Sequence, residues 1–114
     1  MATTYDISTI TNDTLNAITF NVTVDAVALD LTGATITMQA RATRDTAPVL
    51  SLTSVASAGI TITNAINGQF KINKQILIVA PGIYLYDIQF LMLSGDVHTY
   101  VSGNLTMIGD ITHV

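Results

Sequence analysis

The sequence contains no cysteine, no tryptophan and no glutamate, and only 11% of its 114 residues are charged. The absence of cysteine excludes disulfide bonds, thiolate metal sites and thiol nucleophiles. A typical soluble domain has about 25% charged residues, so neutral Thr, Ser and Asn side chains must cover much of this surface. Charges are depleted at the cores of protein interfaces, so the composition suits a subunit that packs against neighbours. It equally suits an ordinary β-sheet protein, because β-branched Thr is favoured in strands.

Positive charge is scarce, since the basic residues are only Arg41, Arg44, Lys71 and Lys74 and the net charge is −4. Nucleic acids and anionic membrane surfaces are bound mainly by clustered Lys and Arg, which this chain does not have. No run of 18 apolar residues is long enough to span a membrane, and the first residues lack the features of a signal peptide. We therefore expect no nucleic-acid partner, no membrane partner and synthesis in the cytoplasm.

The strongest pattern lies in residues 81–112, where two long runs of alternating apolar residues meet at Ser94-Gly95-Asp96. Alternation of this kind predicts a β-hairpin with one buried face. The residues predicted to be buried are Tyr84, Tyr86, Ile88 and Phe90 in the first run and Val97, Val101, Leu105 and Met107 in the second. A hairpin is not stable alone in water, so a second sheet must cover this face.

Shorter runs of the same type recur upstream, without a helical period longer than two turns. They predict strands near residues 16–25, 28–31, 34–42, 49–53, 60–63 and 69–73, the last two joined by a tight turn at Asn67-Gly68. Residues 43–48 should form a loop and residues 74–80 a turn-like crossover. The pattern predicts an all-β, immunoglobulin-like two-sheet antiparallel sandwich of about seven or eight strands over residues 15–114. Residues 1–14 should form an extended N-terminal arm that docks on a neighbour.

The segment Asp30–Arg41 resembles a strand signature of the small Ig-like domains of tailed-phage structural proteins. Four further segments follow in the order and spacing of that family: Gly59–Ile62, Asn67–Ile72, Ala80–Phe90 and Ser102–Met107. The resemblance covers about residues 16–112. Within that family, the chain is similar to the N-terminal domain of phage upper-baseplate proteins. It implies a non-catalytic virion component made in the host cytoplasm. Because the long downstream regions of upper-baseplate proteins are missing, it favours a stand-alone connector, decoration, fibre-base or adaptor subunit.

The chain offers little for catalysis or metal binding. His98 and His113 are the only imidazoles, and neither has the neighbouring ligands that a metal site requires. Ser94, Ser102 and Asp96 lie near His98 in sequence, but no glycine-rich elbow is available to form an oxyanion hole. We therefore expect no enzyme, no cofactor and no metal, and we expect the Asp residues to serve in turns.

Two hypotheses of different kinds remain. The first is a structural subunit that binds other virion proteins and copies of itself, for example as a trimer. Its predicted interface residues are Thr3, Tyr5, Ile7 and Ile10 on the arm and Leu85 and Leu91 on the outward face of the hairpin. The alternative is a carbohydrate- or receptor-binding module on the virion surface that uses Tyr84, Tyr86 and Tyr100 as an aromatic platform, although alternation predicts that Tyr84 and Tyr86 are buried.

Overall fold

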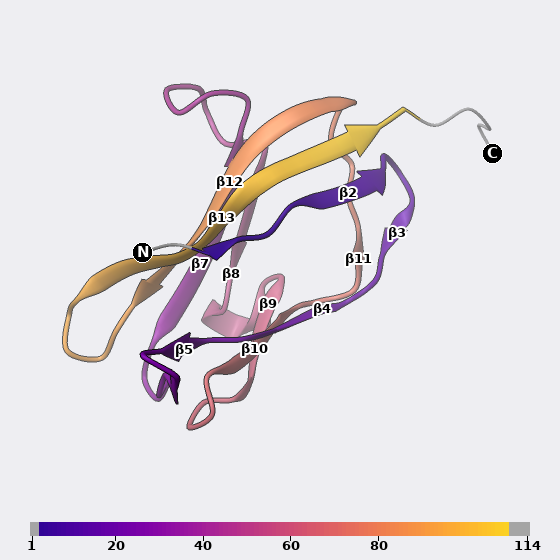
Figure 1. Ribbon diagram of the computed structural model, residues 1–114. Helices are drawn as coiled ribbons and strands as arrows, with labels where there is room; N and C mark the ends of the chain where they lie inside the picture. Colours follow the sequence, from indigo (N-terminus) through magenta and orange to yellow (C-terminus); the bar gives the residue numbers. More distant parts are fainter. Residues whose placement is uncertain (1–2, 110–114) are drawn as a thin grey trace.

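The computed structural model describes residues 3–109, and these are built almost entirely from β-strands (Figure 1). The prediction of an all-β protein is confirmed. The larger sheet has six strands in the order β1, β13, β12, β7, β8, with β2 also paired to β13. Their bounds are β1 Thr3–Thr4, β2 Ile7–Ile10, β7 Thr35–Arg41, β8 Leu50–Thr53, β12 Gly82–Leu91 and β13 Val97–Ile108.

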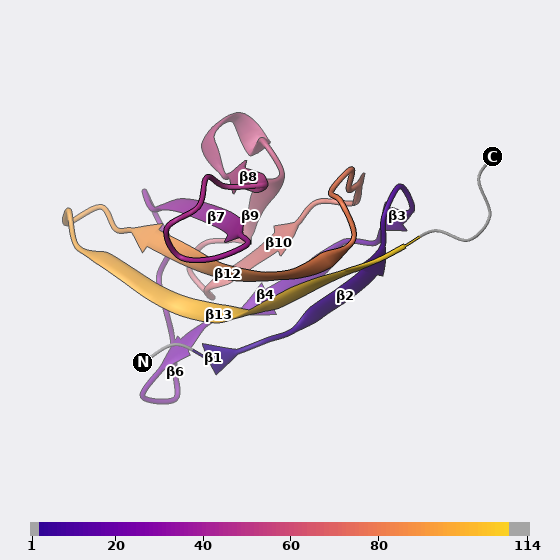
Figure 2. The same cartoon turned by 90° about the horizontal axis from the view of Figure 1, so that it is seen from above.

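A three-stranded sheet, in the order β4, β10, β9, forms a second layer against the first (Figure 2). Its strands are β4 Ile18–Asn21, β9 Ile60–Asn64 and β10 Gln69–Ile72. Two short antiparallel pairs complete the described part: β3 Thr14–Leu15 with β11 Gln75–Ile76, and β5 Thr23–Val24 with β6 Val27–Ala28. One turn of 3₁₀ helix, Val55–Ser57, follows β8. The two facing sheets give a β-sandwich-like arrangement.

The core lies between the layers and contains alternate residues of the long strands, as the alternation predicts. Aromatic rings cross it from one sheet to the other. Phe20 of β4 stacks on Phe70 of β10, and Phe70 makes an edge contact with Phe90 of β12. The largest completely buried side chains come from both layers: Leu31, Ile36, Met38, Ile60, Phe70, Ile72, Ile88, Phe90 and Leu105.

The hairpin β12–β13 forms as predicted, with one exception at its tip. Tyr84, Tyr86, Ile88 and Phe90 are all buried. Val97 was predicted to share the buried face of β13, but it is 57% exposed. The register shifts between the pairs Ile88–Val101 and Gln89–Thr99, so one extra residue in β13 reverses the alternation beyond it. Sequence alternation does not reveal such a bulge.

Several shorter predictions are confirmed. Strands β9 and β10 are paired across a turn at Asn67-Gly68, where Gly68 has a φ of 68° that suits glycine. Residues 43–48 contain no strand. Residues 74–80 differ from the predicted turn-like crossover, because Gln75–Ile76 pairs with β3 and the side chains of Leu77 and Val79 are buried.

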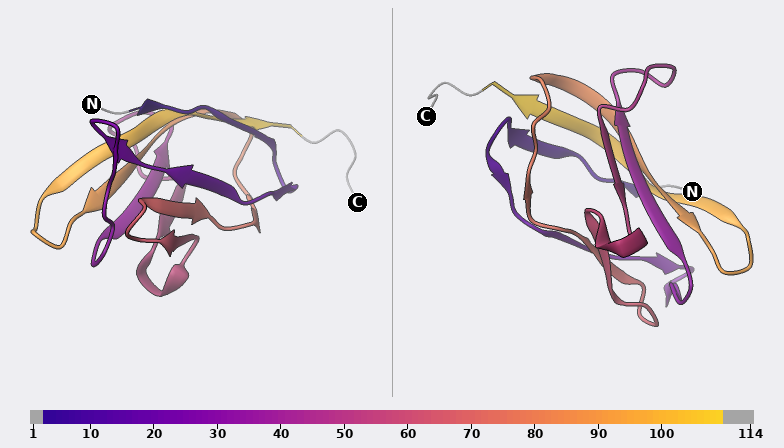
Figure 3. Two further views of the ribbon diagram at one scale, coloured as in Figure 1. Left: turned by 60° about the horizontal axis from the view of Figure 1, so that its bottom comes forward. Right: turned by 180° about the vertical axis from the view of Figure 1, so that it is seen from behind.

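The N-terminal segment predicted as an arm lies along the edge of its own sheet (Figure 3). Strands β1 and β2 both pair with β13 in parallel, Thr3 opposite Val101 and Ile7 opposite Leu105. Thr11, just after β2, is buried and donates a hydrogen bond from Oγ1 to the carbonyl oxygen of Val79 at 2.6 Å. In this structure the described part of the segment is therefore an edge strand of the domain.

Candidate functional site

The outward face of the larger sheet holds both hairpin residues predicted to form an interface. Leu85 and Leu91 lie on β12 and are 46% and 47% exposed. Alternation places them opposite the buried Tyr84–Phe90 face, which is where the sequence analysis expected them.

The residues predicted on the N-terminal segment are divided between two environments. Thr3, Tyr5 and Ile10 are exposed, and the Tyr5 ring makes an edge contact with Phe20. Ile7 is only 4% exposed and belongs to the core of its own chain. The choice of Ile7 as a contact for a neighbour therefore disagrees with this structure, because parallel pairing of β2 with β13 turns its side chain inward.

Besides the predicted Leu85, Leu91 and Ile10, the outward face carries further exposed apolar residues. The exposed apolar residues lie mainly at the two ends of this face. At one end Leu91 pairs with Val97, which the bulge has turned outward. At the other end Ile10 pairs with Ile108, and Ile83 lies nearby on β12. Exposed apolar patches on a soluble protein commonly mark interaction sites.

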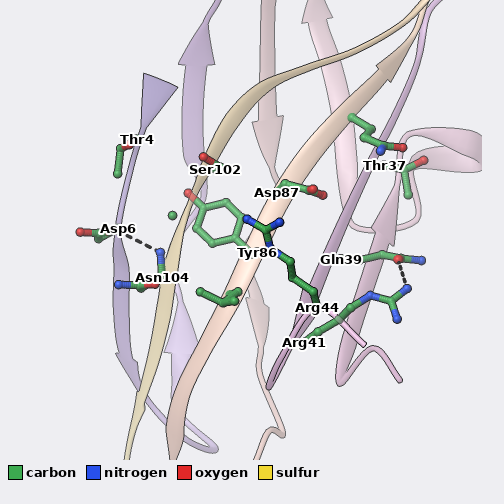
Figure 4. Close-up of a pocket in the computed structure, with 13 residues that line it drawn as sticks. Thr4, Asp6, Thr37, Gln39, Arg41, Arg44, Tyr86, Asp87, Ser102 and Asn104 are labelled. Carbon is green, nitrogen blue, oxygen red and sulfur yellow. Dashed lines mark hydrogen bonds between the residues drawn. The ribbon is translucent and has the colours of Figure 1, made fainter. Parts of the chain in front are cut away.

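Between these two ends the face is hollowed into an open concavity of about 1010 Å³ (Figure 4). Its lining comes from β7, β12, β13, the N-terminal segment and the loop between β7 and β8, and it is mostly polar. The charged lining residues are Asp6, Arg41, Arg44 and Asp87. We name this region the outer concavity.

The two arginines are held differently. Arg41 donates hydrogen bonds from Nη1 to the carbonyl oxygen of Thr46 at 2.6 Å and from Nη2 to Oε1 of Gln39 at 2.8 Å, and both acceptors are neutral. Arg44 extends from the loop, and Figure 4 draws no hydrogen bond from Arg44 or Asp87 to another lining residue. The guanidinium of Arg41 is thus held in place over the sheet without a carboxylate partner among the described residues.

One wall of the outer concavity is formed by the short stretch of chain that joins β1 to β2 and contains Tyr5 and Asp6. The Tyr86 hydroxyl donates a hydrogen bond to the Tyr5 carbonyl oxygen. The backbone N–H of Asn104 donates a hydrogen bond to Oδ1 of Asp6 at 3.0 Å. A Cβ atom on Gly103 would collide with the Tyr5 carbonyl, so glycine leaves room for this stretch. Burial, followed by the charge of Asp6, raises the pKa of Tyr86 above its ordinary value.

No group of three or more His, Cys, Asp or Glu side chains that could hold a metal ion occurs within residues 3–109. The ring centroid of His98 lies 5.4 Å from that of Tyr100, and His113 lies outside the described residues. Asp30 has a turn role, since the amide and hydroxyl of Thr32 donate to its carboxylate and lower its pKa.

The aromatic platform considered for sugar binding is not available on the surface. Tyr84 is 8% exposed and donates its hydroxyl to the carbonyl oxygen of Ala80 at 2.6 Å, while Tyr86 is 4% exposed. Tyr100 packs edge-on against Phe90. Because the rings of Tyr84 and Tyr86 lie in the core, they cannot stack against a sugar.

Comparison with known proteins found no match to a family model, to a curated protein or to a solved structure. Among residues 3–109 there is also no helix of the length and hydropathy needed to cross a membrane.

Sequence reasoning missed the outer concavity, although part of its signal was present. In the sequence, Ile36, Met38 and Ala40 alternate with polar residues, a pattern that places Gln39 and Arg41 on the outward face of their strand. Their proximity to Asp87 follows only from the register of β7 against β12, in which Gln39 lies opposite Asp87 and Arg41 opposite Leu85. That register depends on contacts between residues about 45 positions apart, which a local pattern does not contain.

Proposed function

We propose that the protein is a non-catalytic structural subunit of a tailed-phage virion, with an immunoglobulin-like fold. Two features support the fold. The order β1/β2, β13, β12, β7, β8 over β4, β10, β9 suits a two-sheet sandwich with a parallel edge strand. The hydrogen bond from Tyr84, near the start of β12, to the Ala80 carbonyl has the form of the tyrosine corner described for such sandwiches.

The phage assignment rests on the ordered set of motifs. These motifs coincide with strands that pack on one another: Asp30–Arg41 ends in β7, Ala80–Phe90 spans most of β12, and Ser102–Met107 lies in β13. The resemblance therefore covers the central strands of the larger sheet and is not confined to one turn or loop.

The observation that carries the proposed role is the exposed apolar side chains on the outward face of the larger sheet. Leu85 and Leu91 are nearly half exposed, and Ile83 is 68% exposed on the same strand. Complete burial of an exposed apolar side chain contributes about 1.5–3 kcal/mol, so covering the exposed parts of Leu85, Leu91 and Ile83 would favour the binding of a neighbour by a fraction of that for each residue. We expect that neighbour to be another virion protein or a second copy of this chain, in a connector, decoration, fibre-base or baseplate/tail adaptor.

The test is to look for the protein in purified particles of the phage that encodes it, by mass spectrometry, with wild type and with Leu85→Asp/Leu91→Asp. Wild type should be a stoichiometric particle component, and the double variant should fold but be depleted from particles. An Ile66→Asp variant is the matched control, because Ile66 is 71% exposed in the turn between β9 and β10. Absence of the wild-type protein from particles would reject the proposal.

A further inference from the structure

The outer concavity contains both arginines of the chain and two of its eight aspartates. The two lysines are elsewhere, Lys71 on β10 of the other layer and Lys74 just after it. Charges of both signs therefore lie side by side on one face, while no ion pair joins them within the described residues. Asp6 accepts a hydrogen bond from the backbone N–H of Asn104, and Arg41 donates to Thr46 and Gln39. Arg44 and Asp87 are therefore the two charged lining residues for which Figure 4 draws no hydrogen bond to another lining residue.

The mixed charge narrows the class of partner. A polyanion such as a nucleic acid, or a small acidic ligand, would be attracted by the arginines but repelled by Asp87 in the same hollow. A partner that carries both signs would pair with both Arg44 and Asp87. A second copy of this face carries both signs, and in a two-fold contact, which uses the same patch on both chains, Arg44 of each copy can pair with Asp87 of the other.

The apolar residues fit the same partner. The charged centre is flanked by Leu91 and Val97 at one end and by Ile10, Ile83 and Ile108 at the other. A protein interface commonly buries about 800 Å² on each partner. The longest strand of the larger sheet, β13, has 12 residues and is about 40 Å long, and the neighbouring strands of the sheet lie about 4.8 Å apart, so the outward face is comparable in size with that area.

We infer that the protein forms a two-fold dimer through the outward faces of its larger sheets, in which Arg44 on the β7–β8 loop of each copy enters the outer concavity of the other and lies opposite Asp87. This inference rests on the proposed function as an assembly subunit and names its first partner. Each dimer then contains two equivalent sets of opposite charges, with apolar contacts at the ends of the face. The contact is closed, because a two-fold operation uses the same patch on both chains.

The test uses two charge reversals, Arg44→Asp and Asp87→Arg, chosen because neither side chain has a hydrogen bond to another residue of the concavity. Each variant alone places like charges opposite each other twice in a dimer, so its dimer dissociation constant should rise about tenfold or more at low salt. An equimolar mixture of the two variants places opposite charges together at both positions. The mixture should therefore form a heterodimer close to wild type in affinity.

Sedimentation equilibrium of wild type, each variant and the mixture measures these constants, and thermal unfolding verifies that each variant is folded. Lys74→Asp and Asp13→Arg are the matched controls, because they make the same changes of charge at exposed positions outside the concavity. Both controls should dimerise like wild type. Wild-type dimerisation should also weaken as salt rises from about 0.1 M to about 1 M, where screening shortens the Debye length from about 10 Å to about 3 Å.

Three results would overturn the inference: a wild-type protein that stays monomeric, a trimer as the smallest assembly, or single reversals that dimerise as tightly as wild type. Failure to regain the heterodimer on mixing would also overturn it. None of these results tests the proposed virion role, which depends on whether the protein is present in particles.

Discussion

At the scale of single residues, a hydrogen bond from Tyr86 to the Tyr5 carbonyl oxygen holds the N-terminal segment between β1 and β2 against the sheet. Gly103 leaves the space in which this bond forms. Tyr86 lies on the core side of β12, directly opposite Gly103 of β13 in the register. Its hydroxyl reaches the Tyr5 carbonyl because no side chain at position 103 stands between them. The sequence shows the tyrosine and the glycine but not that they meet, because Tyr5 is 81 positions away from Tyr86.

Replacing Gly103 with Ala should destabilise the fold by about 1–3 kcal/mol, the usual cost of forcing an extra carbon into a packed site. The added Cβ would collide with backbone atoms of Tyr5, which cannot move without disturbing the pairing of β1. Urea unfolding measures the loss. Gly109→Ala is the control, since its Cβ would meet only Pro81 at an ordinary 3.7 Å. Equal effects at the two positions would contradict this account of Gly103.

The raised pKa of Tyr86 predicts a loss of stability in alkali. The folded state holds the phenol proton more tightly than the unfolded state, whose tyrosine pKa is about 10. Below about pH 10 both states keep the proton and stability does not depend on it, whereas above about pH 10 only the unfolded state releases it and the free energy of unfolding falls. Unfolding titrations from neutral to alkaline pH should show a shallower fall for Tyr86→Phe. An identical slope in wild type and variant would contradict the prediction.

At the scale of elements, the alternation of apolar and polar residues predicted the strands that have one face in the core and the other face in solvent. It identified the inward residues of β7 and β12 and the β9–β10 pair because those strands are regular over most of their length. It did not identify the bulge near Tyr100 or the role of the N-terminal segment. Both depend on pairing between distant parts of the chain, and short polar strands such as β1 carry little local signal.

The N-terminal strand should contribute strongly to stability through one side chain. Ile7→Ala removes a buried side chain from the core, so we expect a loss of about 2–5 kcal/mol. Ile10→Ala in the same strand removes a side chain that is 40% exposed, so the loss should stay below about 1 kcal/mol. Denaturant unfolding of both variants measures the difference. A small loss at Ile7 would support the original prediction of an arm that does not belong to its own core.

At the scale of the whole molecule, the two layers of described strands leave the outward face of the larger sheet uncovered. The core side of the larger sheet is packed against the second layer, while its outward side combines exposed leucines and isoleucines with the outer concavity. Composition suggested a subunit that packs against neighbours but did not say where. We propose the outward side of β12 as the location, where the half-exposed Leu85 and Leu91 flank Asp87 and Gln89.

Substituting Leu85 and Leu91 together by Asp should therefore separate assembly from folding. Both side chains are already about half exposed, so the free energy of unfolding should change by no more than about 1 kcal/mol. Association with any partner that covers the face should weaken by more than tenfold, because two apolar contacts would be replaced by charged side chains that lose their hydration on binding. Unchanged association would place the interface elsewhere on the molecule.

We propose that this protein is a virion subunit held to its neighbours through the outward face of the larger sheet. The decisive experiment is an electron cryo-microscopy map of intact particles of a phage whose genome carries this sequence. The account predicts density for this two-layer domain, with Leu85, Leu91 and the outer concavity covered by a neighbouring chain. Particles without the domain, or particles in which that face is open to solvent, would contradict the account.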